Sequence, residues 1–410
     1  MRIEAKSVSL DDLEAMAMAN NPTLVQANAQ IRAARGGSYQ AGRWFNPVVG
    51  YTSDQIGVNG TAGELQGGFV SQEFVTGGKL RLSRQKWAQR ARIAETNLTA
   101  QHGRVLNDVR VFFYRALAAQ QHVQVQQRIL DNVKDHVLTR KEMLNLGQAN
   151  QASMLQAEVD LQRSQLNLQG AENDLHQAWQ NLVAMVGMPE LQKARLSGSL
   201  EADTEPLEWQ TAIHQLLENS PELIAAWEKV RHDEITVQRE RVEPIPNLMI
   251  SANVGRNFET GDAVTGVTVG FALPIFDRNR GTVQQARADL SRSRANVKRL
   301  ELELSMRLAA QHRNYQTAWQ HVQVYRSGML PKSKKAYELL HESYKARRAA
   351  WPDVLAAQRM YLDLQLQYIN QLVSYRESDV AIRGMLLSGG LVEPPAPISG
   401  GHIDAVPKPR

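Results

Sequence analysis

The sequence contains no cysteine among its 410 residues, which excludes disulfide bonds, thiolate metal sites and cysteine nucleophiles. Aromatic residues make up only 6% of the chain, a low share that favours long packed helices over thick globular cores. The longest nearly apolar run, 263–276, is shorter than the ~18–20 residues of a membrane-spanning helix, and it alternates like a strand. Any contact with a membrane is therefore expected to use β-strands.

Motifs for catalysis, metal binding and nucleic-acid binding are also missing. The ten histidines are scattered without an HExxH pattern, and no Ser/His/Asp set shows a recognisable spacing. Met185 and Met188 lie beside Pro189, which favours packing at a helix end over copper binding. The net charge of +5 arises from bases interleaved with acids, which is typical of a solvated helical surface. We expect a non-enzymatic protein with no cofactor, no metal site and no nucleic-acid partner.

What the chain does contain is a duplication. Asn20–Leu24 (Asn-Asn-Pro-Thr-Leu) returns about 200 residues later as Asn219–Leu223 (Asn-Ser-Pro-Glu-Leu), and further short matches follow in the same order. This order predicts two structural repeats, 1–205 and 206–388. The tail, 389–410, is rich in proline and is expected to be disordered.

The first repeat begins with signals for helices and strands. A Ser-x-x-Asp capping box at Ser9 begins a helix that ends near residue 20, and Pro22 begins a second helix. Strand-like segments follow at 48–56 and 65–75. Glycine and proline then become rare, so one helix is predicted over 79–146, about 100 Å long at ~1.5 Å per residue. Its apolar residues recur at helical spacing, at Val105, Val109, Phe112 and Ala116.

The return helix of the first repeat is predicted to begin at a second capping box, Ser153 with Gln156, and to end at Val186. The second repeat follows the same order of elements. Its predicted ranges are short helices at 209–219 and 221–241, strands after residue 246 that include 267–275, a long helix over 281–346 and a return helix over 351–389. Pro331 falls inside the long helix, where it must kink or break the helix.

The strand pairs require partners outside their own chain. Each repeat supplies one two-stranded ribbon with one apolar face, and such a ribbon is marginally stable alone. Four strands cannot close a barrel with a useful lumen, so strands from several chains are needed to remove the exposed edges. Three copies of a duplicated chain would form six near-equivalent units. We predict a homotrimer of a mainly α chain with a small β part.

These features resemble the TolC-type outer-membrane efflux channels. The resemblance rests on the helix starts at Asn21–Leu24 and Ser220–Leu223 and on the pair Asn46-Pro47. It also rests on the strand end Leu273–Phe276 and on two motifs at the turns between long helices, Gly147 to Glu158 and Tyr344 to Gln358. Because the order and the duplicated spacing of these motifs match, the resemblance covers about residues 9–388.

The resemblance implies a trimer whose chains contribute four strands each to a twelve-stranded β-barrel in outer-membrane lipid. A barrel of α-helices would continue this channel through the periplasm. The implied partners are a periplasmic adaptor protein and an inner-membrane efflux pump, in a tripartite system that exports metal ions or drugs. Within the family the chain is most similar to the heavy-metal efflux subgroup. Many members of that subgroup begin with a signal peptide that ends at a lipid-modified cysteine, and Met1–Glu4 shows no such pattern.

The two turns between long helices are the candidate functional sites. The resemblance implies a periplasmic gate there, formed by Tyr344, Asp353 and Ser153 together with Arg347 or Arg348. Relatives usually have a glycine where this chain has Arg347 or Arg348, and one of the two arginines is expected to replace the neighbouring basic residue of the gate. Symmetry in a trimer would turn these side chains into charged rings. Asp353 could instead simply favour the N-terminus of its helix.

The same turns are expected to dock the adaptor protein. The candidate docking residues are Gly147, Leu155, Ala157, Leu355 and Ala357. An ordinary role in packing between helices is equally compatible with the leucines and alanines.

A non-enzymatic coiled-coil scaffold of the periplasm or cytoplasm is the alternative function. The long polar-faced helices favour it. The alternating strand segments at matching points of both repeats do not, because a scaffold has no need of them.

Overall fold

The computed structural model describes residues 7–57, 60, 64–147, 150–201 and 206–397. These residues divide into two compact units, each assembled from both halves of the sequence. The hairpin unit comprises Met1–Val25, Ala100–Ser220 and Leu302–Glu393. The sheet unit comprises Gln26–Thr99, Pro221–Glu301 and Pro394–Arg410. The units do not coincide with the two sequence repeats, and the repeats stay a prediction.

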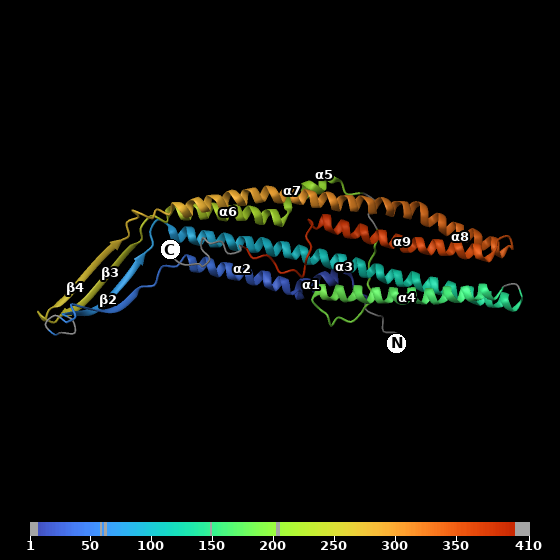
Figure 1. Cartoon of the computed structure of the whole chain (residues 1–410), viewed down its shortest axis with the longest axis horizontal. Coiled ribbons are helices and arrows are strands. Elements are labelled where there is room, and N and C mark those ends of the chain that lie inside the picture. Colours follow the sequence, from blue (N-terminus) through green and yellow to red (C-terminus); the bar gives the residue numbers. More distant parts are fainter. Residues whose placement is uncertain (1–6, 58–59, 61–63, 148–149, 202–205, 398–410) are drawn as a thin grey trace. The chain divides into compact units, whose positions relative to one another are not determined.

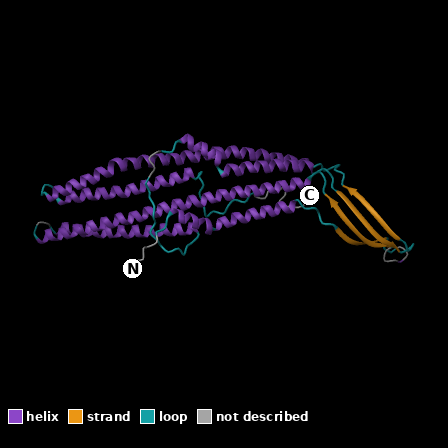
Figure 2. Ribbon diagram, turned by 180° about the vertical axis from the view of Figure 1, so that it is seen from behind, coloured by secondary structure: helices purple, strands orange, loops and turns teal. Residues whose placement is uncertain are grey.

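The sheet unit contains one antiparallel sheet in the order β1-β2-β3-β4 (Figures 1 and 2). The strands are β1 Val48–Asp54, β2 Leu65–Phe74, β3 Leu248–Asn257 and β4 Ala263–Phe271. The ribbons of the two sequence halves are joined by pairing of β2 with β3. Among the described residues β1 pairs only with β2, and β4 pairs only with β3, so both outer edges are open.

The strand segments are thus close to the predicted ones, with one correction. The strand predicted over 267–275 ends at Phe271. Pro274 has no N–H to donate to a neighbouring strand, and the N–H of Ile275 donates to the carbonyl oxygen of Leu273 at 2.9 Å. The chain therefore turns out of the sheet here.

The two faces of the sheet differ in polarity. The register puts Val49, Val70, Ala252 and Val267 in one row across the strands, and apolar residues dominate that face. Val49 is 74% exposed and Val267 is 69% exposed. The opposite face carries small and polar residues. The structure thus confirms the alternation that the sequence predicts. The apolar face is a surface that the described residues do not cover.

The helices of the sheet unit pack closely around the first part of α3. These helices are α2 Pro22–Ala41, α3 Lys79–Asn145, α6 Pro221–Val242 and α7 Arg280–Val324, of which α3 and α7 continue into the hairpin unit. A Cβ atom on Gly37 would lie 2.6 Å from the ring of Trp87, so glycine is needed where α2 meets α3. Between α3 and α6, the buried Arg239 donates through Nε to Oγ of Ser83 at 2.9 Å.

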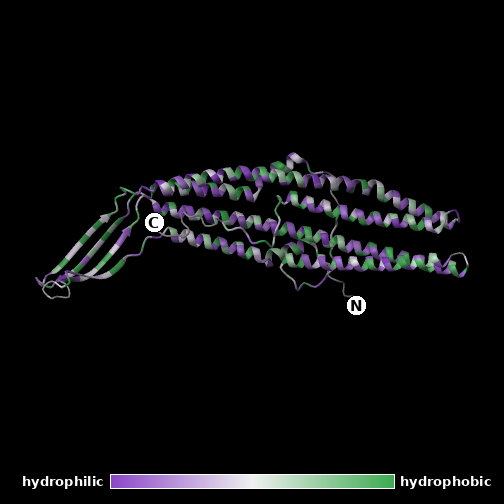
Figure 3. Cartoon of the chain, viewed as in Figure 1, coloured by the Kyte–Doolittle hydropathy of each residue, from purple (hydrophilic) through white to green (hydrophobic). Residues whose placement is uncertain are grey.

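The hairpin unit holds the remaining helices, and in every long helix hydrophobic and hydrophilic residues are interspersed (Figure 3). They are α1 Leu10–Asn20, α4 Gln151–Val186, α5 Trp209–Asn219, α8 Leu330–Lys345, α9 Trp351–Arg383 and the later parts of α3 and α7. Each helix in the described part of the chain is too short or too polar to span a lipid bilayer. The capping box at Ser9 is confirmed, because its hydroxyl accepts from the N–H of Asp12 and the Asp12 carboxylate accepts from the N–H of Ser9.

The predicted helical spacing on α3 needs one correction. Val105, Val109 and Ala116 are fully buried as expected, whereas Phe112 is only half-buried. Phe113 is 1% exposed and occupies the core position instead. A step of four from Val109 followed by a step of three keeps the helical period, so spacing alone could not separate two adjacent phenylalanines.

Pro331 interrupts the long helix of the second half, as predicted. The five residues Tyr325–Met329 form a π-helical turn between α7 and α8. A proline ring cannot fit against an unaltered preceding turn, and the wider π turn relieves that clash. Gly328, the fourth residue of this turn, carries no side chain.

The predicted disorder of the tail is wrong for residues 389–397, while residues 398–410 lie outside the described residues. In the hairpin unit, the N–H groups of Gly389 and Gly390 donate to Oδ2 of Asp108 at 2.9 and 2.7 Å, and Gly390 O accepts from Thr23 and Gln101. In the sheet unit, Asn97 donates to the carbonyl oxygen of Pro395 at 3.0 Å. Side chains far away in the sequence therefore hold a segment whose composition favours disorder. We call residues 389–395 the C-terminal strap.

A buried histidine lies between α6 and α3 of the sheet unit. His232 is 5% exposed, and its Nδ1 lies 3.0 Å from Oδ1 of Asp233. Burial lowers the pKa of His232 to about 4 despite the hydrogen bond to Asp233, and Lys229 and Arg90 lower it further. Burial also acts to raise the pKa of Asp233, but hydrogen bonds from His232 and Lys229 bring it below 3.8.

We predict a pH dependence of stability from His232. In the unfolded chain its pKa is near 6.5, whereas in the folded chain it is about 4. The unfolded state therefore binds more protons between these values, and the free energy of unfolding should fall by on the order of 2–3 kcal/mol as pH drops through this window. Denaturant unfolding of the wild type and of His232→Asn across this window measures the two slopes.

The variant should show a flatter slope than the wild type, whatever its absolute stability. His214→Asn, on the surface of α5, is the matched control and should keep the wild-type slope. Equal slopes for the wild type and His232→Asn would contradict the assignment.

Candidate functional site

The first turn between long helices lies at the end of α3. Gly147 has φ of +69°, a left-handed conformation that suits glycine, and its N–H donates to the carbonyl oxygen of Leu144 at 3.0 Å. Helix α4 then begins at Gln151, with Asn150 as its N-cap. The predicted capping box of Ser153 with Gln156 is therefore wrong. The N–H of Ser153 donates to Oδ1 of Asn150 at 2.8 Å, because an asparagine three residues earlier caps the helix.

The second turn lies between α8 and α9. The N–H groups of Arg347 and Arg348 donate to the carbonyl oxygens of Tyr344 and Ser343 at 2.8 and 2.7 Å, which closes the last turn of α8. Arg347 has φ of +56°, so it holds the left-handed position at which a glycine would carry no steric cost. Arg347, rather than Arg348, therefore has the backbone conformation that glycine favours.

Aromatic rings support this second turn from inside. The rings of Tyr344 and Trp351 lie 4.7 Å apart, and His341 and Tyr337 continue the stack down α8. The last turn of α8 is thereby packed against the first turn of α9. Asp353 lies exposed in that first turn of α9, a position that favours the helix N-terminus electrostatically and also presents a carboxylate to solvent.

The structure brings four of the five predicted gate residues into one turn. Tyr344, Arg347, Arg348 and Asp353 are all exposed there and close in sequence. Ser153 belongs to the other hairpin, and its hydroxyl donates to the carbonyl oxygen of Asn150 at 2.8 Å. Ser153 thus takes part in its own helix cap.

The predicted docking residues differ in their accessibility. Gly147 is exposed, and Leu155 is 54% exposed. Ala157 is 1% exposed and belongs to the packing between helices, while Leu355 and Ala357 are half-buried. Among the five predicted docking residues, Gly147 and Leu155 are therefore the most accessible to a partner.

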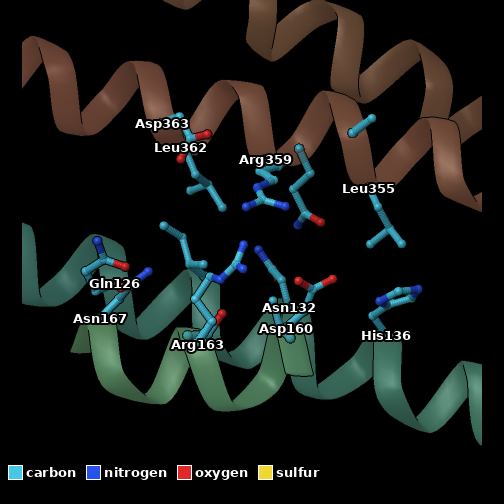
Figure 4. Close-up of a pocket in the computed structure, with 15 residues that line it drawn as sticks. Gln126, Asn132, His136, Asp160, Arg163, Asn167, Leu355, Arg359, Leu362 and Asp363 are labelled. Carbon is cyan, nitrogen blue, oxygen red and sulfur yellow. The ribbon is translucent and has the colours of Figure 1, made fainter. Parts of the chain in front are cut away.

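A cleft of about 300 Å³ lies between the two helical hairpins, α3 with α4 and α8 with α9 (Figure 4). Its charged side chains are Asp160 and Arg163 on α4 and Arg359 and Asp363 on α9. The remaining lining residues are Gln126, Ile129, Asn132, Val133, His136, Ser164, Asn167, Leu355, Ala356, Gln358 and Leu362. Because leucine and charged side chains line it together, the cleft is amphipathic.

The cleft carries opposite charge orders on its two sides. On α4 the acid precedes the base, whereas on α9 the base precedes the acid, so the two helices offer complementary charges. Beside them, burial and the guanidinium of Arg140 lower the pKa of His136, while Asp160 opposes that shift. Arg140 donates through Nε to Nε2 of His136 at 3.1 Å. A neutral imidazole that accepts this bond is the form that the surroundings favour.

The sequence analysis missed this cleft. Nothing in the spacing of Asp160, Arg163, Arg359 and Asp363 marks them as one site in the sequence. The pairing of the two hairpins was needed to show that the charges face one cleft. Within the described ranges, no group of three or more histidines and carboxylates could hold a metal ion.

We predict that Arg347→Gly stabilises the second turn. A left-handed residue with a side chain costs about 1 kcal/mol more than glycine there. Hydrogen–deuterium exchange of peptides covering the end of α8 and the start of α9 should slow in this variant. Arg348→Gly, one residue further on and without positive φ, is the matched control and should speed exchange. Faster exchange in both variants would contradict the strain at Arg347.

Comparisons with known proteins identify the family. Residues 13–188 and 212–386 each match the outer membrane efflux protein family. The cobalt-zinc-cadmium resistance protein CzcC of Cupriavidus metallidurans is 25% identical over 375 residues, which cover 90% of this chain and 88% of CzcC. The nickel-cobalt-cadmium resistance protein NccC of Alcaligenes xylosoxydans xylosoxydans is 24% identical over 318 residues, covering 75% of this chain and 70% of NccC.

Solved structures share the fold. The outer-membrane channel OprN aligns with a TM-score of 0.75 at 18% identity, over 93% of this chain and 90% of OprN. VceC, an outer membrane protein of Vibrio cholerae, aligns with a TM-score of 0.73 at 17% identity, over 92% of this chain and 96% of VceC. Because the family match extends through both halves of the sequence and the fold agrees along more than nine-tenths of it, this chain belongs to the outer membrane efflux protein family.

Proposed function

We propose that three copies of this outer membrane efflux protein close into one channel through the outer membrane. The observation that carries the proposal is the sheet, which has two open edges and one exposed apolar face. An open edge in lipid would leave N–H and C=O groups without partners, at a cost of several kcal/mol each. Pairing of β4 in one copy with β1 in the next removes all edges, and three copies supply twelve strands.

The proposed barrel also accounts for the two faces of the sheet. Val49, Tyr51, Val254 and Val267 are between 60% and 74% exposed on one face, where lipid would cover them. The other face would line the lumen with small and polar side chains such as Ser71 and Ser251, whose hydroxyls lie 2.7 Å apart. This apolar-out, polar-in alternation is typical of transmembrane strands.

The proposed channel works in a tripartite system. In it, an inner-membrane pump selects the substrate, a periplasmic adaptor connects pump and channel, and this protein conducts. CzcC and NccC are named for resistance to cobalt, zinc, cadmium and nickel. We propose divalent transition-metal ions as the exported cargo on the strength of these relatives.

The turns between long helices are proposed as the periplasmic end of the channel. Exposed Tyr344, Arg347, Arg348 and Asp353 would form its gate, with Ser153 on the neighbouring turn. The adaptor would dock on Gly147, Leu155 and Leu355. Small side chains at Ala157 and Ala357 would let the helices approach one another closely beneath that surface.

We predict cross-links between copies from cysteines placed on the two open edges. The native chain lacks cysteine, so every disulfide in a double variant is an engineered one. Thr52→Cys on β1 is combined in turn with cysteines on the same face of β4, at Val264, Gly266 or Thr268. After mild oxidation of outer membranes, at least one combination should give covalent dimers and trimers on a denaturing gel.

A matched control keeps the cross-link within one chain. The double variant Ser71→Cys with Ser251→Cys joins paired strands β2 and β3 and should migrate as a monomer. Monomers alone for every β1–β4 combination would count against the ring, and recovery of the protein in the soluble fraction would favour a scaffold.

We predict that Asp353→Ala opens the proposed gate. In the proposed gate the carboxylate of Asp353 helps to hold the mouth closed together with the arginines, so its loss should loosen the closed state, and the single-channel conductance in a planar lipid bilayer should rise severalfold. Glu218→Ala, a surface acid on α5, is the control and should leave the conductance unchanged. A conductance equal to the wild type in Asp353→Ala would assign Asp353 to its helix N-terminus instead.

A further inference from the structure

We propose that the segment after β4 binds the phosphate headgroups of anionic glycerophospholipids in the leaflet next to the helices. The inference rests on the proposed barrel, because it assumes that the apolar face of the sheet lies in lipid. The segment, Leu273–Arg280, is called the lipid collar. It combines exposed apolar side chains with two guanidinium groups that the described residues leave without an ion-pair partner.

The apolar half of the collar directly follows β4. Leu273 and Ile275 lie in the turn after the strand and are 66% and 60% exposed. Phe276 is 99% exposed, so nothing in the described chain packs against its ring. A phenylalanine ring that is fully open to water is less favourable than a buried one. Acyl chains beside the sheet would cover it.

The charged half of the collar begins two residues after Phe276. Arg278 and Arg280 are exposed, and neither forms an ion pair with any described residue. Together with Ile275, Phe276, Asp277 and Gly281, they line a recess of about 420 Å³. Guanidinium groups bind phosphate oxygens in a two-pronged geometry, and they lie where a headgroup would meet water.

The acidic groups near the two arginines are engaged elsewhere. Oδ1 of Asp277 accepts from the N–H of Asn279 at 2.8 Å, and Oε2 of Glu240 accepts from Nδ2 of Asn279 at 3.0 Å. Asn279 itself has φ of +54°. These bonds fix the turn between the two arginines and direct the carboxylates toward Asn279. The recess therefore keeps a surplus of positive charge, which complements an anionic lipid.

Exposed aromatic and basic side chains also lie at the other edge of the sheet. Just before β1, Trp44 is 55% exposed, and the guanidinium of Arg43 lies 3.7 Å from the ring centre of Tyr39. In the proposed ring, β1 of one copy adjoins β4 of the next, so Arg43 and Trp44 of that copy would reach the level of the collar. An aromatic and basic belt at one height is what a membrane–water interface favours.

Native mass spectrometry of the full-length oligomer tests the proposal. The wild type and the double variant Arg278→Gln with Arg280→Gln are titrated in neutral detergent with phosphatidylglycerol and, separately, with phosphatidylcholine of the same chains. The wild type should retain phosphatidylglycerol in preference. The double variant should retain it roughly thirtyfold less, since each of the two basic groups contributes about 1 kcal/mol near a surface. Phosphatidylcholine retention should be unchanged.

Two further variants separate the contributions. Arg287→Gln with Arg292→Gln removes two exposed charges further along α7 and should behave as the wild type. Phe276→Gln removes the apolar anchor and should weaken retention of both lipids. An unchanged preference for phosphatidylglycerol in the Arg278/Arg280 variant would overturn the proposal. The partner of the collar would then be taken to be an acidic surface of another protein.

Assembly is scored separately on the same samples. If the variant still runs as a trimer from outer membranes, a lost or retained lipid preference reports on the collar alone. If even the wild type fails to assemble into a trimer, the proposed barrel fails, irrespective of lipid binding.

Discussion

Hydrogen bonds that the sheet cannot complete are the constraint on which the rest of this protein depends. Each of the strands β1 and β4 has a partner on one side only within the described chain. Water can satisfy such an edge, but hydrocarbon cannot. Contact of the apolar face of the same sheet with water is unfavourable, because side chains such as Val49 and Val267 are mostly exposed there. The two properties together favour association with further copies over a free monomer.

Capping residues, prolines and residue spacing predicted most helices and strands correctly. Where two adjacent or nearby residues suited the same position, the prediction chose the wrong one. Ser9 and Pro22 begin α1 and α2 as their chemistry predicts. Helix α3 runs from Lys79 to Asn145 because it contains no proline and a single glycine, Gly103. Asn150 and Ser153 are both good caps, so sequence alone could not choose between them. In the same way, residue spacing alone could not show that Phe113, rather than Phe112, is the buried residue.

Tertiary contacts decided what the sequence could not show. The strap looks disordered by composition, yet Asp108 and Gln101 hold its backbone in the hairpin unit. The charged cleft requires two hairpins from different halves of the sequence to meet. The turns themselves were predicted as candidate sites. The left-handed backbone conformation of Arg347 could not be predicted, because arginine has no preference for it. The functional roles of these turn residues stay predictions.

The C-terminal strap has a consequence for the order in which the chain can mature. Thr23 and Gly390, which lie 367 positions apart in the sequence, share one hydrogen bond in the hairpin unit. That unit also draws on the middle of the chain, through Ala100–Ser220. The hairpin unit therefore cannot complete its native contacts until the strap residues have been added to the growing chain, which differs from the usual sequential maturation of domains. Chaperones that bind incomplete chains would have to protect this unit until residue 390 has been synthesised.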